Sequence, residues 1–162
     1  MTTAGGRLVG IAGRIGRRTP MQESAGGRIT VAAGLEGDFK GAKYPRRQIT
    51  LLAREAWQAA LNEIGHAALP WTVRRANLLI EGVRLPRAAG GIVRIGQVRL
   101  EVTGQTYPCQ RMNEACAGLL SALAKDWRGG VTARVIEGGF VAHGDCVEVL
   151  VDPPEIKPRL PG

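Results

Sequence analysis

One cysteine in this sequence stands where a side chain could do chemistry. Cys109 lies in the stretch Thr103–Met112, directly after Pro108 and two residues before Arg111. Loops held between regular elements often carry reactive groups, and a cation beside a thiol favours the thiolate, which is the nucleophilic and metal-binding form. The alternative is structural, because free cysteines are among the most frequently buried residues. The local sequence leaves both interpretations of Cys109 open.

The other two cysteines are predicted to be structural. Cys116 falls on the apolar stripe of a predicted helix, and Cys146 lies in a predicted strand. Three cysteines without a Cys-x-x-Cys pair indicate neither a disulfide framework nor a structural zinc site, and they fit a reducing compartment. We therefore expect Cys109 to be the first of the three thiols to react with an alkylating reagent.

The charge balance predicts an anionic partner. Lys plus Arg number 22 against 14 Asp plus Glu, which gives a formal net charge of +8. Arginine binds phosphate in planar or bidentate geometry, so a phosphorylated cofactor, nucleic acid and simple solubility are all compatible with this excess. With 3 Trp, 2 Tyr and 2 Phe there is little material for a base-stacking platform, which makes nucleic acid the weakest candidate.

The N-terminus has no continuous apolar segment of the kind found in secretory signals, and no run approaches ~18 apolar residues. We therefore expect a cytoplasmic protein without membrane contact. The length suits one domain with a sizeable core, assigned to residues 1–151. Residues 152–162 contain Pro153, Pro154, Pro158 and Pro161 and are expected to form a disordered tail.

Period-two alternation of apolar and polar residues predicts short strands along most of the chain. They are expected at residues 7–14, 28–33, 72–80, 93–95, 98–103, 131–136 and 140–149. Two amphipathic helices are expected, one over 51–65 with Gly65 at its end and one over 113–127 that begins at Asn113. Many strands with two inserted helices and no βαβ alternation predict a mainly β fold, a closed or partly closed barrel.

Basic residues cluster at two further places. Lys40 and Lys43 fall in a loop that we expect to be mobile and exposed, whereas Arg47 begins an apolar run. In the predicted 72–80 strand, alternation places Arg75 and Asn77 on one face and Arg74 on the other.

Several short motifs, taken in order, resemble the MOSC domain, the module named after the C-terminal part of molybdenum cofactor sulfurases. They include Gly34-Leu-Glu-Gly-Asp38, Arg47-Gln-Ile-Thr-Leu-Leu52, Arg74-Arg-Ala-Asn-Leu-Leu79, Val102-Thr-Gly104, Pro108-Cys109, Arg128-Gly-Gly130 and Gly144-Asp145. Each motif is weak alone, but their order and spacing over Val9 to Val149 are specific.

The resemblance implies a pyruvate-kinase-barrel-like β-barrel with a cysteine that carries sulfur as a persulfide or ligates molybdenum of the pterin cofactor. That cysteine corresponds to Cys109, and the family's arginine and asparagine positions correspond to Arg75 and Asn77. The full set that we predict to bind the molybdenum cofactor (molybdopterin) is Arg47, Arg75, Asn77, Thr103, Arg111 and Arg128, with Cys109 as the catalytic sulfur or the metal ligand.

The resemblance also implies partners. No pyridoxal-phosphate desulfurase domain is present in this chain, so a cysteine desulfurase or another sulfur donor would have to supply the sulfane sulfur. The alternative function is molybdenum-cofactor-dependent reduction of N-hydroxylated compounds, with an electron-donor protein as partner. This chain lacks the additional N-terminal domain of the mitochondrial amidoxime reducing component, which weakens that alternative. A basic barrel that binds nucleic acid is the third and least favoured function.

Overall fold

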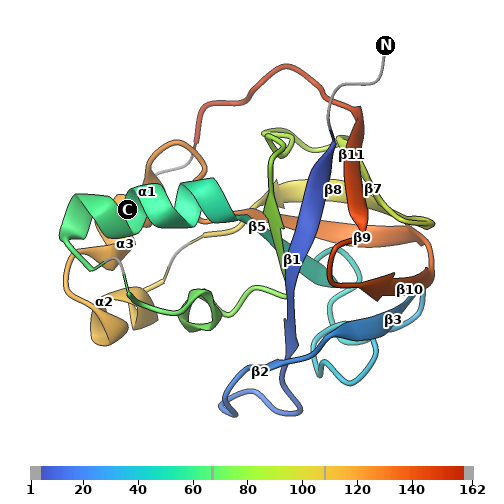
Figure 1. The fold of residues 1–162 in the computed structure, drawn as a ribbon, viewed down its shortest axis with the longest axis horizontal. Coiled ribbons are helices and arrows are strands. Elements are labelled where there is room, and N and C mark those ends of the chain that lie inside the picture. Colours follow the sequence, from blue (N-terminus) through green and yellow to red (C-terminus); the bar gives the residue numbers. More distant parts are fainter. Residues whose placement is uncertain (1–4, 67, 108, 159–162) are drawn as a thin grey trace.

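Seven strands of the computed structural model close into one barrel (Figure 1). The structure describes residues 5–66, 68–107 and 109–158. The barrel strands are β1 (Gly6–Gly13), β5 (Ile49–Ala53), β6 (Leu78–Glu81), β7 (Ile92–Ile95), β8 (Val98–Gln105), β9 (Val131–Glu137) and β11 (Cys146–Val151). They pair in the order β11-β7-β8-β9-β5-β6-β1, and pairing of β1 with β11 completes the circle. Only β5 and β6 are parallel within it, so the predicted closed, mainly β fold is confirmed.

A smaller sheet extends the barrel on the side away from the helices (Figure 1). It contains β10 (Gly139–Ala142), β3 (Gly26–Thr30) and β4 (Gly34–Leu35), while the two-residue β2 (Gln22–Glu23) pairs with the end of β1. The single strand predicted over 140–149 is thus two strands, because a turn at Gly144, where φ is 97°, separates β10 from β11.

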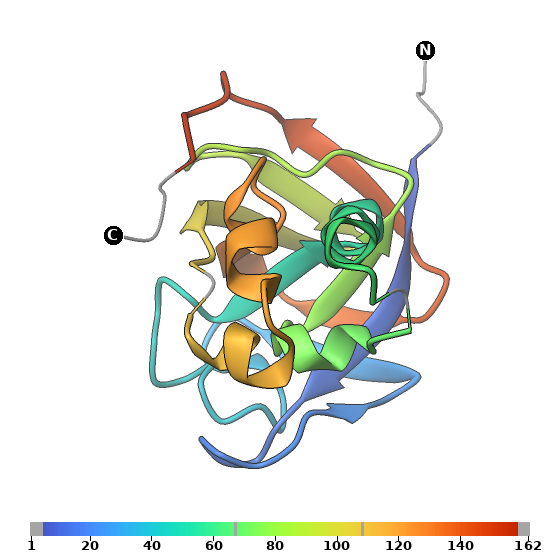
Figure 2. The same cartoon turned by 90° about the vertical axis from the view of Figure 1, so that its left-hand side faces the viewer.

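The helices gather at one end of the barrel, the end that faces the viewer in Figure 2. They are α1 (Arg54–Ile64), the 3-10 helix η1 (Trp71–Arg74), α2 (Arg111–Ala115) and α3 (Leu119–Ala124). Their apolar faces form a cluster that is separate from the barrel core and includes Leu52, Trp57, Leu61, Met112, Leu119 and Leu123. The barrel core itself is aliphatic, with Leu8, Ile49, Leu78, Val93 and Leu100 fully buried. The helical end and the barrel therefore meet along β5 and β6.

The first predicted helix begins three residues later than expected. Leu51 and Leu52 belong to β5, because they pair in parallel with Leu78 and Leu79 of β6 and so complete the barrel. Gly65 does end the helix in a left-handed conformation, with φ of 76°, as its position predicts.

The second predicted helix is two short helices. Gly118, with φ of 88°, separates α2 from α3. Asn113 lies inside α2, and its Oδ1 accepts a hydrogen bond from the Leu120 amide at 3.1 Å, so it supports the first turn of α3 rather than starting α2. Asp126 and Trp127 follow α3 in the left-handed region, with φ of 50° and 56°.

The strand predicted over 72–80 is correct only at its end. Trp71–Arg74 is a 3-10 helix, Arg75 has a left-handed φ of 66°, and extended pairing begins at Leu78. Trp71 and Val73 pack on the helical cluster, which holds this segment out of the sheet. The predicted alternation of Arg74, Arg75 and Asn77 is therefore wrong.

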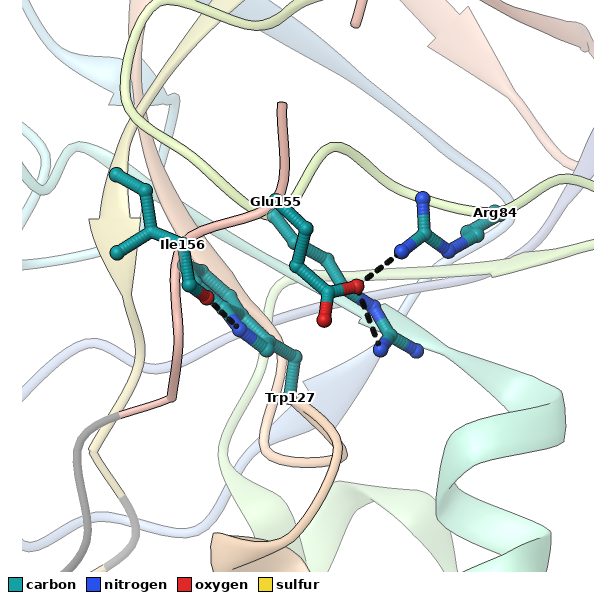
Figure 3. A network of polar contacts seen from close by, with 5 residues as sticks. Arg84, Trp127, Glu155 and Ile156 are labelled. Carbon is teal, nitrogen blue, oxygen red and sulfur yellow. Dashed lines mark hydrogen bonds and ion pairs between the residues drawn. The ribbon is translucent and has the colours of Figure 1, made fainter. Parts of the chain in front are cut away.

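The tail makes defined contacts where the structure describes it. Arg84 and Arg87 both form ion pairs with Glu155, and the indole N–H of Trp127 donates to the Ile156 carbonyl oxygen at 2.9 Å (Figure 3). Residues 159–162 lie outside the described residues, so disorder of the tail stays a prediction. Among the described helices, none has the length and apolar character needed to cross a membrane.

Candidate functional site

Cys109 is exposed and borders a cavity of about 440 Å³ at the helical end of the barrel, here called the Cys109 cavity. Its walls come from the loop after β1, from the loop between β4 and β5, from Thr50 of β5, from the η1 turn and from the start of α2. Pro108, which the sequence places before the sulfur, lies outside the described residues. The structural alternative for Cys109, a thiol buried as a small hydrophobe, does not hold.

Seven cationic side chains line the Cys109 cavity. They are Arg14, Arg17, Lys40, Arg47, Arg74, Arg75 and Arg111. Within the described part of the chain, none of them forms an ion pair with a carboxylate within 4.0 Å. Asp38 is buried beside this group, and its charge acts on Arg14 and Lys40. One carboxylate cannot neutralise seven cations, so the cavity carries an excess of positive charge.

Arg74 lies deepest in this group and is only 6% exposed. Its Nε donates to the Gly129 carbonyl oxygen at 3.0 Å, and its Nη2 donates to that of Thr106 at 3.4 Å. Burial lowers the pKa of Arg74 to about 10, and the interaction with Cys109 opposes that change. A side chain at position 129 would place its Cβ 2.9 Å from the Thr106 oxygen and 3.3 Å from Arg74 Nη2, so the approach requires a glycine there.

Lys40 is the second deeply placed cation. Its Nζ donates to Thr50 Oγ1 at 2.7 Å. Burial lowers the pKa of Lys40 to about 8; Asp38 acts in the opposite direction, and the neighbouring arginines lower it further. Lys40 is therefore close to losing its proton near neutral pH, unlike a solvated lysine. The expectation that Lys40 belongs to a mobile exposed loop is wrong.

Two arginines at the rim are held by aromatic rings. The guanidinium carbon of Arg14 lies 5.0 Å from the centroid of Phe39, and that of Arg47 lies 4.9 Å from the centroid of Tyr44. Such cation–π contacts fix a guanidinium without neutralising its charge. The two arginines thus stay available to an anion while their side chains are restrained.

Two buried donors in the walls have no hydrogen-bond partner among the described residues. They are Arg75 Nε and Thr106 Oγ1. Another nitrogen of the same guanidinium, Arg75 Nη2, donates to the carbonyl oxygens of Arg17 and Thr19 at 3.2 and 3.1 Å. A buried polar atom without a partner is costly, which makes these two atoms candidates for ligand contacts.

Three of the six predicted cofactor-binding residues share the cavity with Cys109: Arg47, Arg75 and Arg111. Asn77 does not. It is fully buried, its Oδ1 accepts from the Thr50 amide at 2.9 Å, and its Nδ2 donates to the Ala12 carbonyl oxygen at 3.1 Å. Asn77 therefore braces β5 against β1 and has no atom left for a ligand in this cavity.

Thr103 and Arg128 also lie elsewhere. The Thr103 hydroxyl contacts the Arg46 carbonyl oxygen and the Thr132 hydroxyl, and its side chain borders neighbouring surface depressions. Arg128 Nη1 donates to Glu63 at 3.0 Å and to the Ala122 carbonyl oxygen at 3.1 Å. The charge of Arg128 is thus already compensated by a carboxylate.

Four cations of the cavity were missed by reasoning from the sequence: Arg14, Arg17, Lys40 and Arg74. Two of them had a usable signal. Lys40 follows Gly37-Asp38, and Arg74 opens the Arg74–Leu79 motif, both within stretches that resemble the MOSC domain. Arg14 and Arg17 lie in an N-terminal loop that no motif marks.

The two remaining cysteines differ from one another. Cys116 is half-buried against the helical cluster, in agreement with a packing role. Cys146 is exposed, and Arg7 Nη1 lies 3.0 Å from its sulfur. Cys146 lies in β11, as predicted from the sequence, and outside the Cys109 cavity, so its structural role stays a prediction.

Solved structures share this fold. The YUAD protein from Bacillus subtilis is 16% identical over 89% of this chain and 95% of that one, with a TM-score of 0.75. YiiM from Escherichia coli is 19% identical over 93% and 72% of the two chains, with a TM-score of 0.67. YiiM from Geobacillus stearothermophilus is 14% identical over 90% and 75%, with a TM-score of 0.71.

Comparison with curated proteins finds no match for this sequence. The family model of the MOSC domain does match, over residues 36–148, which is more than half of the chain. This range contains Lys40, Arg47, Arg74, Arg75, Cys109 and Arg111 of the cavity. Barrel, motifs and family model agree, and the chain belongs to the MOSC domain family.

Proposed function

We propose that this protein is a MOSC sulfur carrier or molybdenum-cofactor-binding protein in which Cys109 holds sulfane sulfur or ligates molybdenum. One observation carries the proposal: an exposed thiol borders a cavity with seven cations that lack carboxylate partners among the described residues. Positive charge favours a thiolate, which accepts sulfane sulfur and also binds soft metals.

The sulfur-carrier step needs no redox reagent. The Cys109 thiolate attacks the terminal sulfur of a persulfide on a donor such as a cysteine desulfurase, and the donor's own thiolate leaves. One sulfur–sulfur bond breaks and one forms, so Cys109 ends as a persulfide. Arg74, Arg75 and Arg111 would stabilise the anionic persulfide by charge, because they line the same cavity.

The cavity also fits an anionic pterin cofactor. Arg75 Nε and Thr106 Oγ1 are buried donors that await acceptors, and the arginines suit a phosphate group. No cluster of three or more His, Cys, Asp or Glu among the described residues could hold a bare metal ion, so the thiolate would be this chain's contribution to molybdenum. The cofactor would supply redox chemistry when bound. Reduction of N-hydroxylated compounds would use this same site, together with an electron-donor protein.

Mass spectrometry tests the sulfur-carrier form. After incubation with a cysteine desulfurase and cysteine, the intact protein is expected to gain one sulfur atom, and Cys109→Ser is expected to abolish the gain. Cys146→Ser is the matched control, because Cys146 is also exposed beside an arginine. A gain that survives Cys109→Ser, or no gain in the wild type, would show that Cys109 is not a sulfur carrier.

Elemental analysis tests the cofactor form. Protein made in a host that synthesises the cofactor is expected to contain molybdenum, whereas protein from a cofactor-deficient host is not. Arg111→Gln should reduce the content and Arg94→Gln should not, because Arg94 is paired with Glu148 on the barrel surface. Equal molybdenum content from both hosts would contradict cofactor binding.

A further inference from the structure

A second cavity, of about 560 Å³, lies beside α1 on the other side of the 127–130 segment and is here called the Trp127 cavity. Most of its wall is apolar and includes Ala56, Ala59, Val83, Leu85, Trp127 and Val131. Among the described residues it shares no wall residue with the Cys109 cavity. Ligand sites are commonly apolar cavities of this size with a few convergent polar groups.

Two arginines of the Trp127 cavity, Arg84 and Arg87, meet one carboxylate at what is here called its rim. Glu155 of the tail reaches both, with Arg87 Nη1 at 3.2 Å from its Oε1 (Figure 3). Two hydrogen bonds hold the backbone of the next tail residue, Ile156. Its amide donates to the Arg87 carbonyl oxygen, and its carbonyl oxygen accepts from the Trp127 indole N–H, both at 2.9 Å. The rim thus already binds a carboxylate, one supplied by the chain itself.

We propose that the Trp127 cavity binds an organic monocarboxylate with an apolar body, and that its carboxylate replaces Glu155 on Arg84 and Arg87. This site involves neither Cys109 nor the function proposed for it. The two arginines converge on one oxygen of a carboxylate, as they do on Glu155 Oε1, and the apolar wall of the cavity matches a hydrocarbon or aromatic body. The side chains of Arg84, Arg87 and Glu155 are 53%, 26% and 44% exposed, so the two ion pairs that must be displaced are partly screened by solvent.

The acidic residues of the cavity set its selectivity. Glu55 and Asp126 line the wall together with the arginines. Glu55 Oε2 already accepts a hydrogen bond from the Gly82 amide at 2.8 Å, so it is fixed in place as a negative charge. A ligand with several negative charges would meet repulsion there, whereas a single carboxylate at the arginines would not. The Trp127 cavity is therefore suited to monoanions, in contrast to the Cys109 cavity.

The probe is 2-naphthoate, and the readout is the indole N–H resonance of Trp127 in ¹⁵N-labelled full-length protein, assigned with Trp127→Phe. Titration is expected to shift this resonance saturably, because the ligand displaces the tail that accepts its hydrogen bond. The neutral analogue 2-naphthylmethanol has the same body without the charge and should bind far more weakly. Cys109→Ser should leave the titration unchanged, which keeps this test separate from that of the sulfur carrier.

Variants then identify the carboxylate position. Glu155→Gln removes the internal competitor and is expected to tighten 2-naphthoate binding about two- to five-fold, the range set by an exposed ion pair. Arg87→Met should weaken it at least about ten-fold, as expected for a lost charged hydrogen bond. Glu148→Gln, which breaks the comparable surface pair with Arg94, should change nothing. Absence of a saturable shift, or equal affinity of Glu155→Gln, Arg87→Met and the wild type, would overturn the proposal and leave the tail contact purely structural.

Discussion

The two cavities contain similar residues in opposite electrostatic states. Arginines of the Trp127 cavity are paired, Arg84 and Arg87 with Glu155 and Arg128 with Glu63. Those of the Cys109 cavity have no carboxylate partner among the described residues, and two of its deepest cations have pKa values lowered by burial. Unpaired buried charge destabilises a fold, so it is retained where it serves a purpose. The two cavities therefore differ mainly in whether carboxylates neutralise their arginines, and less in their volumes.

The largest effect is expected from loosening the strand that both cavities share. β5 contributes Thr50 to one cavity and Ala53 to the other, and Asn77 holds the Thr50 amide. Asn77→Ala should lower the free energy of unfolding in urea by about 2–4 kcal/mol, because it leaves buried backbone groups without partners. Exposed Asn62→Ala in α1 is the control and should cost under about 0.5 kcal/mol.

The same variant tests whether Asn77 belongs to the ligand set. Folded Asn77→Ala is expected to bind anions as the wild type does. If the variant were as stable as the wild type but no longer bound anions, Asn77 would be a ligand-binding residue, as predicted from the sequence.

The second-largest effect is expected from anion binding, which should differ between the two cavities. Pyrophosphate is expected to stabilise the protein by about 2.7 kcal/mol at a concentration of 100 Kd, by linkage to the folded state. The double variant Arg47→Gln, Arg111→Gln should lose most of this stabilisation, because both arginines line the Cys109 cavity without carboxylate partners among the described residues. Arg84→Gln, Arg87→Gln removes the same charge from the other cavity and should keep it. If both double variants behave alike in thermal unfolding, the pyrophosphate effect is general screening and the comparison fails.

The pH dependence of the Cys109 cavity gives the smallest and sharpest effect. An anion favours protonated Lys40, so the contribution of Lys40 to pyrophosphate affinity should be full below pH 8 and fall as pH rises through the pKa of about 8. The fall is at most about ten-fold, or about 1.4 kcal/mol, for each pH unit, and it ends at the higher pKa that Lys40 has in the complex. Isothermal titration at several pH values measures it, and Lys40→Met should remove it. A steep dependence that persists in Lys40→Met would assign the proton to another group.

Without ligand, the sign of the Lys40 effect reverses. The pKa of Lys40 is about 8 in the folded protein against the ordinary 10.5, so the unfolded chain binds more protons between these values. As pH rises from about 8 to 10.5, the titration of Lys40 therefore increases the free energy of unfolding of the ligand-free protein. Below pH 8 the buried charge is a constant cost. Binding and stability thus respond to the same proton in opposite directions.

The sequence predicted the barrel because its strands carry local information. Alternation at Val98, Leu100 and Val102 reports one buried face, and all three are buried in β8. The strand prediction was wrong at residues 72–77. There Trp71 and Val73 pack on the helices, and this packing outweighs the local alternation of apolar and polar residues. Leu51 and Leu52 were wrongly assigned to a helix. Their parallel partners in β6 are 27 positions away, and a local sequence pattern carries no information on such distant pairing.

The site was predictable only where a motif marked it. Cys109 and Arg111 are two positions apart in sequence, and Arg47 and Arg75 lie within motifs, so all four could be found. Arg14 and Arg17 reach the cavity through the loop after β1, and nothing local shows that this loop folds toward Cys109. Asn77 was predicted as a ligand because the resemblance to the MOSC domain aligns it with the family's asparagine, yet its amide is hydrogen-bonded to backbone groups of two strands. Polar residues in one motif can serve the fold and the site separately.

Closure of the barrel by its first and last strands has a consequence for biosynthesis. Arg7 of β1 pairs with Cys146 of β11, so β1 is synthesised well before the strand that covers its edge. At about 5–20 residues per second, β1 waits on the order of ten seconds for that edge to be covered. The delay adds to the slow folding expected of non-local pairing. During that interval the nascent chain presents an unpaired strand edge, which is a template for pairing with another chain.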